Sequence, residues 1–409
     1  MAQPPVAPAV DKYFADVHFP EDPALPHLPR LFQSDWICRA FQEQLPESHG
    51  EPASVRIRHF IHSIGKRALV SYEVTWRKDR YLPPEYFVAK ASAKGAFELA
   101  RYPLDVRLPG LMQAARPGSA LELVNRHVLT MPARRARVQM IRYRPEYRAV
   151  LRQRMGRVRL YARVMRPEDA ESFVAAHQVA TNSAFVVPGL AGCWQDGGIV
   201  WLTEIRGRDL RRRIRQGRFP DPMRLLDGLE SLWRVPLESS GIRPFSLRRA
   251  YVRAKNHFRH NLRDYADSLY QLNGVADALD PFVRSWRPSS MAHNDFYDDQ
   301  LLIMEGGKIA LVDLEDIGPG DPLLDVGNFL AHLRWSAQSR SSDRAEYCQA
   351  FHDDLRRAAL ERLGWDARSL ALREAVCLFR ICTNVIRHPK HDWKSRLDAG
   401  LALVNATLG

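Results

Sequence analysis

The sequence HNDFYDDQ at residues 293–300, followed by the apolar stretch IALV at residues 309–312 and then Asp313, decides how this chain is interpreted. Asp295 and Asp313 each lie in a polar loop, and the short strand pattern between them predicts that the two loops face each other. One aspartate that accepts a proton, beside a second aspartate and the amide oxygen of Gln300, suits Mg²⁺-dependent chemistry at a phosphate. The stretch therefore indicates a catalytic site.

Three motifs occur here in the order seen in a known enzyme family. Residues 293–300 have the spacing of the kinase catalytic loop, H-x-D-x-x-x-x-N, with Gln300 in the last place, and Asp313 lies where the D-F-G aspartate would lie. The sequence GDPLLDVGN at residues 320–328 resembles the G-D-P-x-x-D-L segment of aminoglycoside phosphotransferases and choline kinases. From about residue 137 onwards the chain thus resembles this phosphotransferase family.

The resemblance implies an activity and roles for individual residues. The activity is an ATP- and Mg²⁺-dependent transfer of a phosphoryl group to a hydroxyl of a small molecule, such as a sugar, an amino alcohol or a natural product. Asp295 is then the catalytic base, Gln300 and Asp313 are the metal ligands, and Asp325 is a structural brace for the catalytic loop. His293 is expected to hold the backbone of that loop rather than to act as a base.

Two more carboxylates lie near these motifs. Glu315 is predicted to supplement the metal site, and Asp299 is either a further ligand or a solvated side chain. Gln300 departs from the usual Asn. In having Gln at this place, the sequence resembles sugar-kinase branches of the family such as maltokinase. The longer side chain of Gln300 still offers an amide oxygen to Mg²⁺.

The resemblance also predicts a nucleotide site in the preceding strands. Arg163 occupies the strand position where the family has a phosphate-binding lysine, and Glu171 follows on a helix as its partner. The stretch WLTEIRGRDL at residues 201–210 resembles the hinge that receives adenine. Arginine is always charged and contacts phosphate well, but its shape differs from that of lysine, so Lys90 in an earlier hairpin is the alternative. The predicted nucleotide-binding residues are Arg163, Glu171, Glu204, Ile205 and Lys90.

The periodicity of the chain changes near Glu168. Before it, β-branched and aromatic runs predict strands at residues 55–61, 68–75, 86–89, 137–143, 148–154 and 158–164. After it the pattern is mostly helical, at residues 171–180, 221–279, 323–335, 343–363, 369–386 and 393–408. The order predicts an α+β, bilobal protein kinase-like fold with a strand-rich N-lobe, a helical C-lobe and an N-terminal extension.

This pattern divides the chain into four segments. They are an N-terminal tail with a short helix (1–45), a β-rich extension (46–130), a kinase-like N-lobe (131–205) and a helical C-lobe with the catalytic and metal loops (206–409). The hairpin that leads to Lys90 is similar to the one that leads to Arg163. An internal duplication and two unrelated hairpins are both consistent with this similarity.

Composition limits the remaining possibilities. The 409 residues are 45% hydrophobic and 26% charged, which is typical of a globular protein with a sizeable core. The five cysteines show no C-x-x-C pair, and neither a membrane-spanning run nor a signal-peptide pattern is present, so we expect a cytoplasmic protein with reduced thiols. The formal net charge of +13 favours anionic partners.

Arginine is concentrated in two stretches. Residues 134–163 contain eleven Arg and one Glu, and residues 206–218 contain seven more Arg. Solvated strand and helix faces, a cationic rim around a nucleotide cleft, and an RNA contact all fit this pattern. An RNA-binding protein and a degenerate kinase without turnover are therefore the alternatives. Polycationic aminoglycosides are disfavoured as substrates, because residues 340–409 carry twelve Lys or Arg against nine Asp or Glu.

Overall fold

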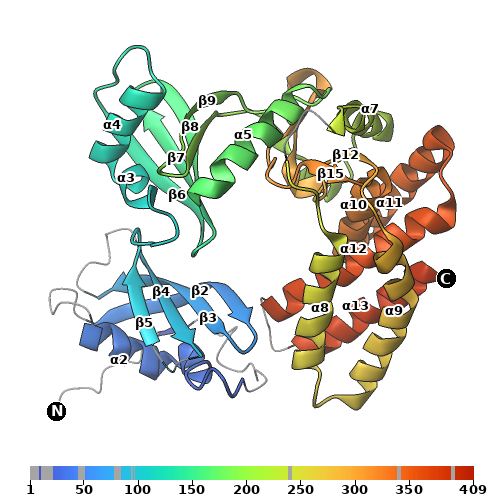
Figure 1. The fold of residues 1–409 in the computed structure, drawn as a ribbon, viewed down its shortest axis with the longest axis horizontal. Helices are drawn as coiled ribbons and strands as arrows, with labels where there is room; N and C mark the ends of the chain where they lie inside the picture. Colours follow the sequence, from blue (N-terminus) through green and yellow to red (C-terminus); the bar gives the residue numbers. More distant parts are fainter. Residues whose placement is uncertain are drawn as a thin grey trace.

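The computed structural model confirms the predicted α+β class, with strands gathered in the first half of the chain and helices in the second (Figure 1). It describes residues 9–10, 22–44, 51–77, 84–93, 95, 97–237, 242–338, 342–387 and 392–409. Residues 1–8 and 11–21 of the predicted N-terminal tail therefore lie outside the described residues. Within the described part of the chain, no helix combines the length and the apolar character needed to cross a membrane.

The first sheet lies in the N-terminal extension. It has the order β1-β2-β3-β4-β5, formed by β1 (Ala9–Val10), β2 (Pro52–Ser63), β3 (Arg67–Trp76), β4 (Glu85–Ser92) and β5 (Phe97–Arg101). Helix α2 (Ser34–Gln44) covers one face, because its buried Phe41 packs against Tyr72, Trp76 and Phe87 of the sheet. Three predicted strands and the predicted helix are therefore present here.

The second sheet has the order β6-β7-β8-β10-β9 and places the nucleotide-site candidates. Its strands are β6 (Ala136–Arg144), β7 (Arg148–Met155), β8 (Val158–Met165), β9 (Leu190–Trp194) and β10 (Ile199–Thr203). Helices α3 (Leu111–Ala115) and α4 (Pro117–His127) pack on one face, against Leu160, Ala162 and Val164 of β8. Because side chains alternate along a strand, Arg163 projects from the opposite face, towards α5 (Pro167–Thr181) and the helical half.

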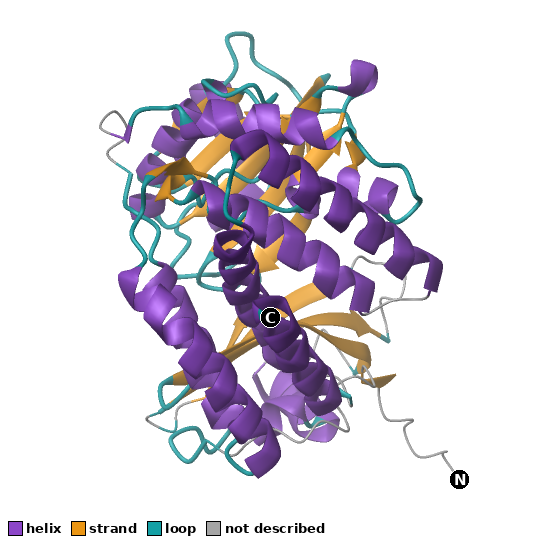
Figure 2. Cartoon of the chain, turned by 90° about the vertical axis from the view of Figure 1, so that its right-hand side faces the viewer, coloured by secondary structure: helices purple, strands orange, loops and turns teal. Residues whose placement is uncertain are grey.

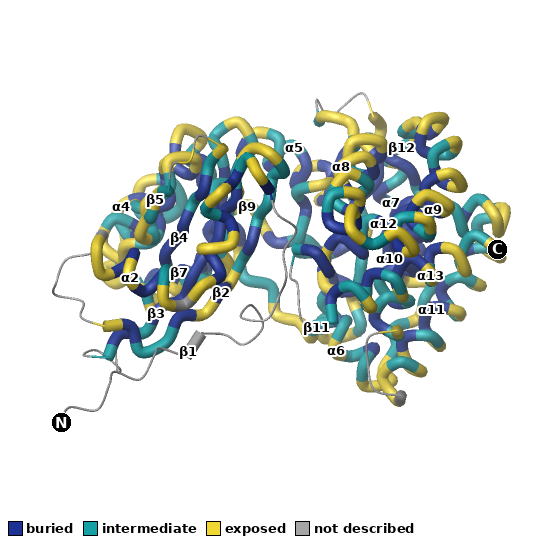
Figure 3. Tube along the Cα trace, turned by 90° about the horizontal axis from the view of Figure 1, so that it is seen from below, coloured by how far each residue is buried: buried dark blue, intermediate teal, exposed yellow. Residues whose placement is uncertain are grey.

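The second half of the chain is built mainly from helices (Figure 2), and its described residues also form one three-stranded and one two-stranded sheet. The helices are α6 (Leu210–Ile214), α7 (Pro222–Trp233), α8 (Leu247–Asn261), α9 (Ala266–Ser285), α10 (Pro322–Gln338), α11 (Ser342–Leu363), α12 (Ala367–Arg387) and α13 (Trp393–Leu408). Buried segments run through α10 and α12 in the interior of this half (Figure 3). These two helices support the loops that carry the predicted catalytic residues.

Short strands hold those loops, as the sequence predicts. Strand β13 (Leu301–Ile303) pairs with β14 (Ile309–Leu311) and with β11 (Arg208–Asp209), and β12 (Ser290–Ala292) pairs with β15 (Gly318–Gly320). Residues 293–300 therefore follow β12 directly, and Asp313 follows β14. Both loops leave paired strands, which fixes where each loop begins.

Candidate active site

The loop at residues 293–297 is fixed by the carboxylate of Asp325, which is fully buried at the start of α10. The backbone N–H of Asn294 donates to Oδ1 of Asp325 at 2.7 Å. The backbone N–H of His293 and the indole N–H of Trp233 both donate to Oδ2, at 2.8 and 3.0 Å. Burial raises the pKa of Asp325 to about 7, although these three donors oppose that rise. Asp325 thus has the geometry of the predicted brace.

A left-handed residue and a glycine allow the loop to turn. Asn294 has a φ of 65°, a conformation that Asn tolerates better than most residues, and its side-chain amide donates to the carbonyl of Asp316 at 2.9 Å. A Cβ atom at Gly320 would lie 2.0 Å from Oδ1 of Asn294. The glycine of the GDP motif is therefore required for the close approach of β15 to this loop.

His293 joins the catalytic loop to the loop of Asp313. Its Nε2 donates to the backbone carbonyl of Asp313 at 2.7 Å, and its Nδ1 accepts a long hydrogen bond from the N–H of Asp295 at 3.4 Å. Burial lowers the pKa of His293 to about 4, so the ring is neutral near pH 7. This geometry fits the positioning role predicted for the residue.

Asp313 lies among arginines from the second sheet. Arg163, which is 7% exposed, donates to Oδ1 of Asp313 at 2.8 Å and also bonds Glu315. Arg148 of β7 pairs with Glu315 and lies 3.7 Å from Oδ2 of Asp313. Burial alone would raise the pKa of Asp313, but Arg163 and Arg148 lower it to about 2. The carboxylate is therefore ionised, and Glu315 is held by two guanidinium groups.

Asp295, Gln300 and Asp313 line one cavity of about 440 Å³ between the second sheet and the helical half. Asp316 lines the same cavity, three residues beyond Asp313. Burial, followed by the charge of Asp316, raises the pKa of Asp295 to about 8. Asp316 is solvent-exposed, and desolvation by the surrounding residues, followed by the charges of Glu315 and Asp313, raises its pKa to about 6. The cavity therefore contains both an ionised carboxylate and carboxylates with raised proton affinity.

The predicted hinge connects the two halves. Glu204 and Ile205 lie in the segment between β10 and β11, and both are partly buried. The carboxylate of Glu204 pairs with Arg152 at 2.9 Å and with Arg159 at 3.1 Å. These pairs attach the connecting segment to β7 and β8 of the second sheet.

The predicted pairing of Arg163 with Glu171 is not formed. Glu171 is exposed on α5, and the residue of that helix that approaches Arg163 is Phe173, whose ring centroid lies 5.1 Å from the guanidinium carbon. Residues two apart on a helix lie on nearly opposite sides, so Phe173 and Glu171 cannot both face the cleft. Asp313 and Glu315 take the place of Glu171 as partners of Arg163.

Lys90 lies on β4 of the first sheet and is bound to other carboxylates. Its ammonium group is 3.6 Å from Glu146 and 3.7 Å from Glu98. Glu146 lies in the turn between β6 and β7, where Arg67 also pairs with it and Asp105 accepts its backbone N–H at 2.8 Å. Lys90 thus links the first sheet to the β6–β7 turn.

Sequence reasoning did not single out several residues around the cavity. Asp316 and Arg148 were missed, although each lies close in sequence to a predicted site residue or strand. The sequence placed Arg211 of α6 only within the arginine-rich stretch at residues 206–218. In the structure it bonds Asp298 at 3.1 Å and pairs with Asp299 at 3.0 Å. Asp299 is 41% exposed at its side chain, so it lies at the rim of the cavity and is paired with an arginine.

The model of the phosphotransferase enzyme family, APH, matches residues 143–360, which is more than half of the chain. The protein therefore belongs to this family. The match covers strands β7, β8, β9 and β10 of the second sheet, both loops and the GDP motif, and it ends within α11. No curated protein sequence matches this chain.

Several solved structures resemble the chain at low identity. A choline kinase from Cryptosporidium parvum Iowa II is 12% identical, with 70% of this chain and 94% of that chain covered and a TM-score of 0.48. A putative aminoglycoside phosphotransferase from Ralstonia eutropha JMP134 is 14% identical, with 70% and 97% covered and a TM-score of 0.47. A thermostable mutant of an aminoglycoside phosphotransferase, in a ternary complex with ADP and hygromycin B, is 14% identical, with 66% and 93% covered and a TM-score of 0.44.

Proposed function

We propose that this protein transfers the γ-phosphoryl group of ATP to a hydroxyl group of a small molecule. The observation that carries the proposal is the convergence of Asp295, Gln300 and Asp313 on one cavity, next to Arg163 and Arg148. Phosphoryl transfer requires positioning and charge stabilisation more than covalent chemistry by the protein, and this set of side chains offers both.

Asp295 is the residue that we assign to the acceptor hydroxyl. It is partly exposed to the cavity, and its raised pKa makes it a better proton acceptor than an ordinary aspartate. Asp325 and His293 hold the backbone on both sides of it, so the carboxylate has a fixed position. We assign Asp295 as the general base on these grounds.

The donor set fits Mg²⁺. Asp313 supplies a carboxylate, Gln300 supplies an amide oxygen, and Asp316 lies in the same cavity as a further carboxylate. Mg²⁺ prefers such oxygen ligands and is usually held by one or two carboxylates together with substrate phosphates. When bound, the ion would neutralise charge on the β- and γ-phosphates. We leave Glu315 out of the ligand set, because Arg148 and Arg163 hold it and, unlike Asp313, it does not line the cavity with Asp295 and Gln300.

Arg163 is the phosphate contact that we propose, in place of the family lysine. It is buried on the strand that faces Asp313, and its Nε has no hydrogen-bond partner. Its present partners are the carboxylates of Asp313 and Glu315. Because we assign Asp313 to Mg²⁺, Nη2 of Arg163 would turn from Asp313 to a phosphate oxygen. Glu204 and Ile205 form the hinge in this proposal, and Lys90 takes no direct part.

We propose that the reaction takes place in the cytoplasm, where ATP is abundant. The five cysteines are free, which fits a reducing compartment. A degenerate kinase differs from this proposal only in lacking turnover. RNA binding is the weaker candidate, because Arg148, Arg163 and Arg211 of the two arginine stretches bond carboxylates around the cavity.

Calorimetric titration with ATP tests the assignments. We expect wild type and Asp295→Ala to bind ATP with similar affinity in the presence of Mg²⁺, and we expect Asp313→Ala to lose the gain in affinity that Mg²⁺ provides. Asp354→Ala, at a position on α11 where the side chain is 46% exposed, is the control. If Mg²⁺ increased the affinity for ATP equally in wild type and in Asp313→Ala, the metal assignment would be overturned.

A further inference from the structure

The cavity that contains Asp295 is also lined by six arginines. Arg142, Arg144 and Arg148 come from the hairpin of β6 and β7, Arg253 comes from α8, and Arg380 and Arg387 come from α12. Arg148 is paired with Glu315 and Asp313. The other five are not explained by the residues assigned so far.

Four of these five form a cluster that we call the arginine cluster: Arg144, Arg253, Arg380 and Arg387. Among the residues that the structure describes, no carboxylate forms an ion pair with any of the four. Nε of Arg144 and Nη1 of Arg380 are buried without a hydrogen-bond partner, and the nearest aromatic contacts are Tyr147 and Phe245. The cluster is therefore a set of cations that no carboxylate among the described residues neutralises in an ion pair.

Positive charges within the cluster help to lower the pKa of one of its members, Arg387. Burial, followed by the charges of Arg144, Arg253 and Arg380, lowers the pKa of Arg387 to about 10. Asp295 and Asp316 line the same cavity, and the charge of Arg380 opposes the rise in the pKa of both. Like charges gathered without counter-ions oppose folding, and a cleft lined by one sign of charge attracts ligands of the other sign.

Helix α12 presents a polar stripe to the cavity. Arg380, Thr383, Asn384 and Arg387 all line it, and their spacing of three, four and seven residues places them on one face of the helix. The two arginines are about 10 Å apart along the helix axis. Arg380 acts on Asp295, and Arg387 lies two turns further away, so the stripe extends from the proposed base into the part of the cavity away from it.

We infer that the arginine cluster binds an anionic group of the acceptor, so that the substrate is a small alcohol that carries a phosphate or a carboxylate. This inference rests on the proposed function, because it places the acceptor hydroxyl at Asp295. Arg387 and Arg253 hold the anionic group, and Arg380 lies between that group and the base. Thr383 and Asn384 offer hydrogen bonds to neutral hydroxyls between the two ends.

The nucleotide does not account for the whole cluster. Arg253 and Arg387 come from helices of the C-terminal half, whereas Arg163, the proposed phosphate contact, comes from β8 of the second sheet. An aminoglycoside is also a poor match, because its ammonium groups would face unpaired guanidinium groups. An anionic acceptor supplies the counter-charge that the cavity lacks.

The test uses two small anions in place of the unknown acceptor. Inorganic phosphate and malonate are titrated calorimetrically into the full-length protein saturated with ADP and Mg²⁺, so that the nucleotide site is already filled. We expect binding of at least one anion and a loss of about tenfold or more in affinity for Arg387→Gln and Arg253→Gln. Arg248→Gln, exposed on the same helix as Arg253, should bind like wild type.

The outcomes separate the two proposals. No anion binding by wild type, or equal affinity in all variants, would overturn the inference about the acceptor. Failure of ADP to bind would instead count against the proposed function, and the anion titration would then be run without nucleotide. Stronger binding of phosphate or of malonate identifies which anionic group the acceptor carries. Arg387→Lys, which keeps the charge, should recover part of the affinity and so excludes misfolding as the cause.

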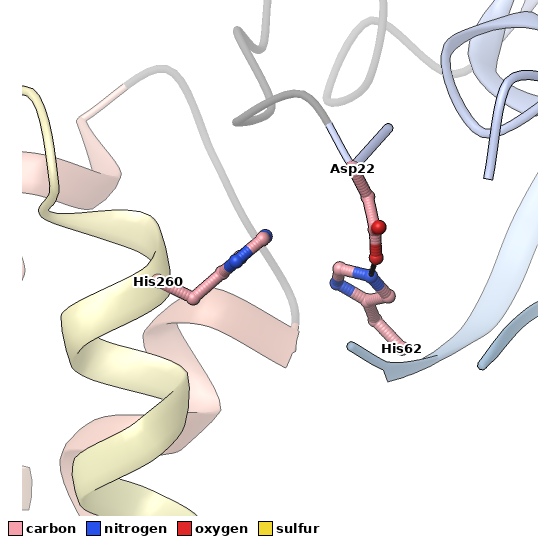
Figure 4. A group of neighbouring side chains, drawn as sticks. All are labelled: Asp22, His62 and His260. Atoms are coloured by element: carbon pink, nitrogen blue, oxygen red, sulfur yellow. Dashed lines mark hydrogen bonds and ion pairs between the residues drawn. The ribbon is translucent and has the colours of Figure 1, made fainter. Parts of the chain in front are cut away.

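A second feature lies between the first sheet and α8, away from the cavity. Asp22, His62 and His260 each present one oxygen or nitrogen atom, and these atoms all lie within 4.8 Å of one another. Oδ2 of Asp22 and Nε2 of His62 are 2.8 Å apart, and the ring of His260 projects towards them from α8 (Figure 4). Nε2 of His260 is buried and has no hydrogen-bond partner.

We propose that Asp22, His62 and His260 bind a Zn²⁺ ion that fastens the N-terminal extension to α8. One carboxylate and two imidazoles are a donor set that Zn²⁺ commonly uses, with a fourth position open to water. Asp22 is already oriented, because its Oδ2 accepts the backbone N–H of Gly65 at 2.9 Å. Arg253 is two turns from His260 on the same helix, so the ion would also fix the helix that lines the cavity.

Thermal unfolding of chelator-treated protein tests this site. Addition of Zn²⁺ should raise the unfolding temperature of wild type and of Asn256→Ala, an exposed control on α8, but not that of His260→Ala. Addition of Mg²⁺ should not reproduce the effect. An equal rise in His260→Ala, or no rise in wild type, would overturn the proposal.

Discussion

Removal of the Asp325 carboxylate should destabilise the protein and disorganise the catalytic loop together. Asp325 is fully buried and accepts three hydrogen bonds, from the backbone of His293 and Asn294 and from the indole of Trp233, all between 2.7 and 3.0 Å. An orphaned buried N–H costs about 1 to 3 kcal/mol. Asp325→Ala orphans all three and should therefore cost about 3 kcal/mol or more.

Asp325→Asn should remove only one of these three hydrogen bonds. An amide keeps one oxygen, which can take the place of Oδ2 and its two donors, and the amide nitrogen then faces the N–H of Asn294. One hydrogen bond is lost, so we expect a cost of about 1 to 3 kcal/mol, smaller than that of the alanine variant.

Urea unfolding followed by circular dichroism measures both variants, with Asp354→Ala as the surface control. Turnover should fall in both variants even where the protein is still folded, because the position of Asp295 depends on this loop. Equal denaturation midpoints for wild type and Asp325→Ala would refute the reasoning. So would an Asp325→Asn variant that is less stable than Asp325→Ala.

Further predictions concern four other residues. Arg163→Ala should weaken ATP binding by about 10- to 150-fold, the cost of one charge-assisted phosphate contact, while Lys90→Ala leaves ATP affinity nearly unchanged; the reverse order of sensitivities would assign the phosphates to Lys90. Burial lowers the pKa of His293 to about 4, whereas an unfolded histidine titrates near pH 6.5, so the unfolded chain takes up the proton first as the pH falls. The stabilising contribution of neutral His293 is therefore complete above about pH 6.5 and is lost towards pH 4, and urea unfolding between about pH 7 and pH 5 should show wild type losing about 2 kcal/mol more than His293→Gln. Arg211→Ala should raise the exposure of the loop at residues 298–300 to hydrogen exchange, since it removes the partner of Asp298 and Asp299, and unchanged protection would contradict this role.

The sequence predicted best the parts of the site that lie close together along the chain. The spacing of His293, Asp295 and Gln300 reflects one loop, and Asp313 follows a short strand that pairs with its neighbour. Asp325 was predicted from its place in the GDP motif, and its hydrogen bonds agree with that prediction. In these segments local spacing determines where the side chains lie.

Contacts between distant segments were harder to predict. Glu171 was expected to face Arg163, but the rotation of α5 places Phe173 there, and only tertiary packing sets that rotation. Glu315 was expected at the metal site, but it pairs with Arg148, which is 167 residues away in sequence. Sequence spacing contains no information on such partners.

One signal was present and was not used. Arg380, Thr383, Asn384 and Arg387 interrupt the otherwise apolar second half of α12, from Ala375 onwards, at helical spacing, which indicates a polar face turned towards a cavity. The pattern was readable, but the neighbours that give it meaning, Arg144 and Arg253, come from other parts of the chain. The arginine cluster therefore required the three-dimensional structure.

The central claim is that the cavity around Asp295 and Asp313 is a phosphotransferase site. Transfer of radiolabelled phosphate from ATP to a panel of neutral, anionic and cationic alcohols tests it most directly, with wild type and Asp295→Ala compared side by side. The account predicts Mg²⁺-dependent transfer by wild type and a fall of about 10²- to 10⁴-fold in Asp295→Ala. Transfer at the same rate by Asp295→Ala, or tight binding of ATP by wild type without transfer to any alcohol, would contradict it.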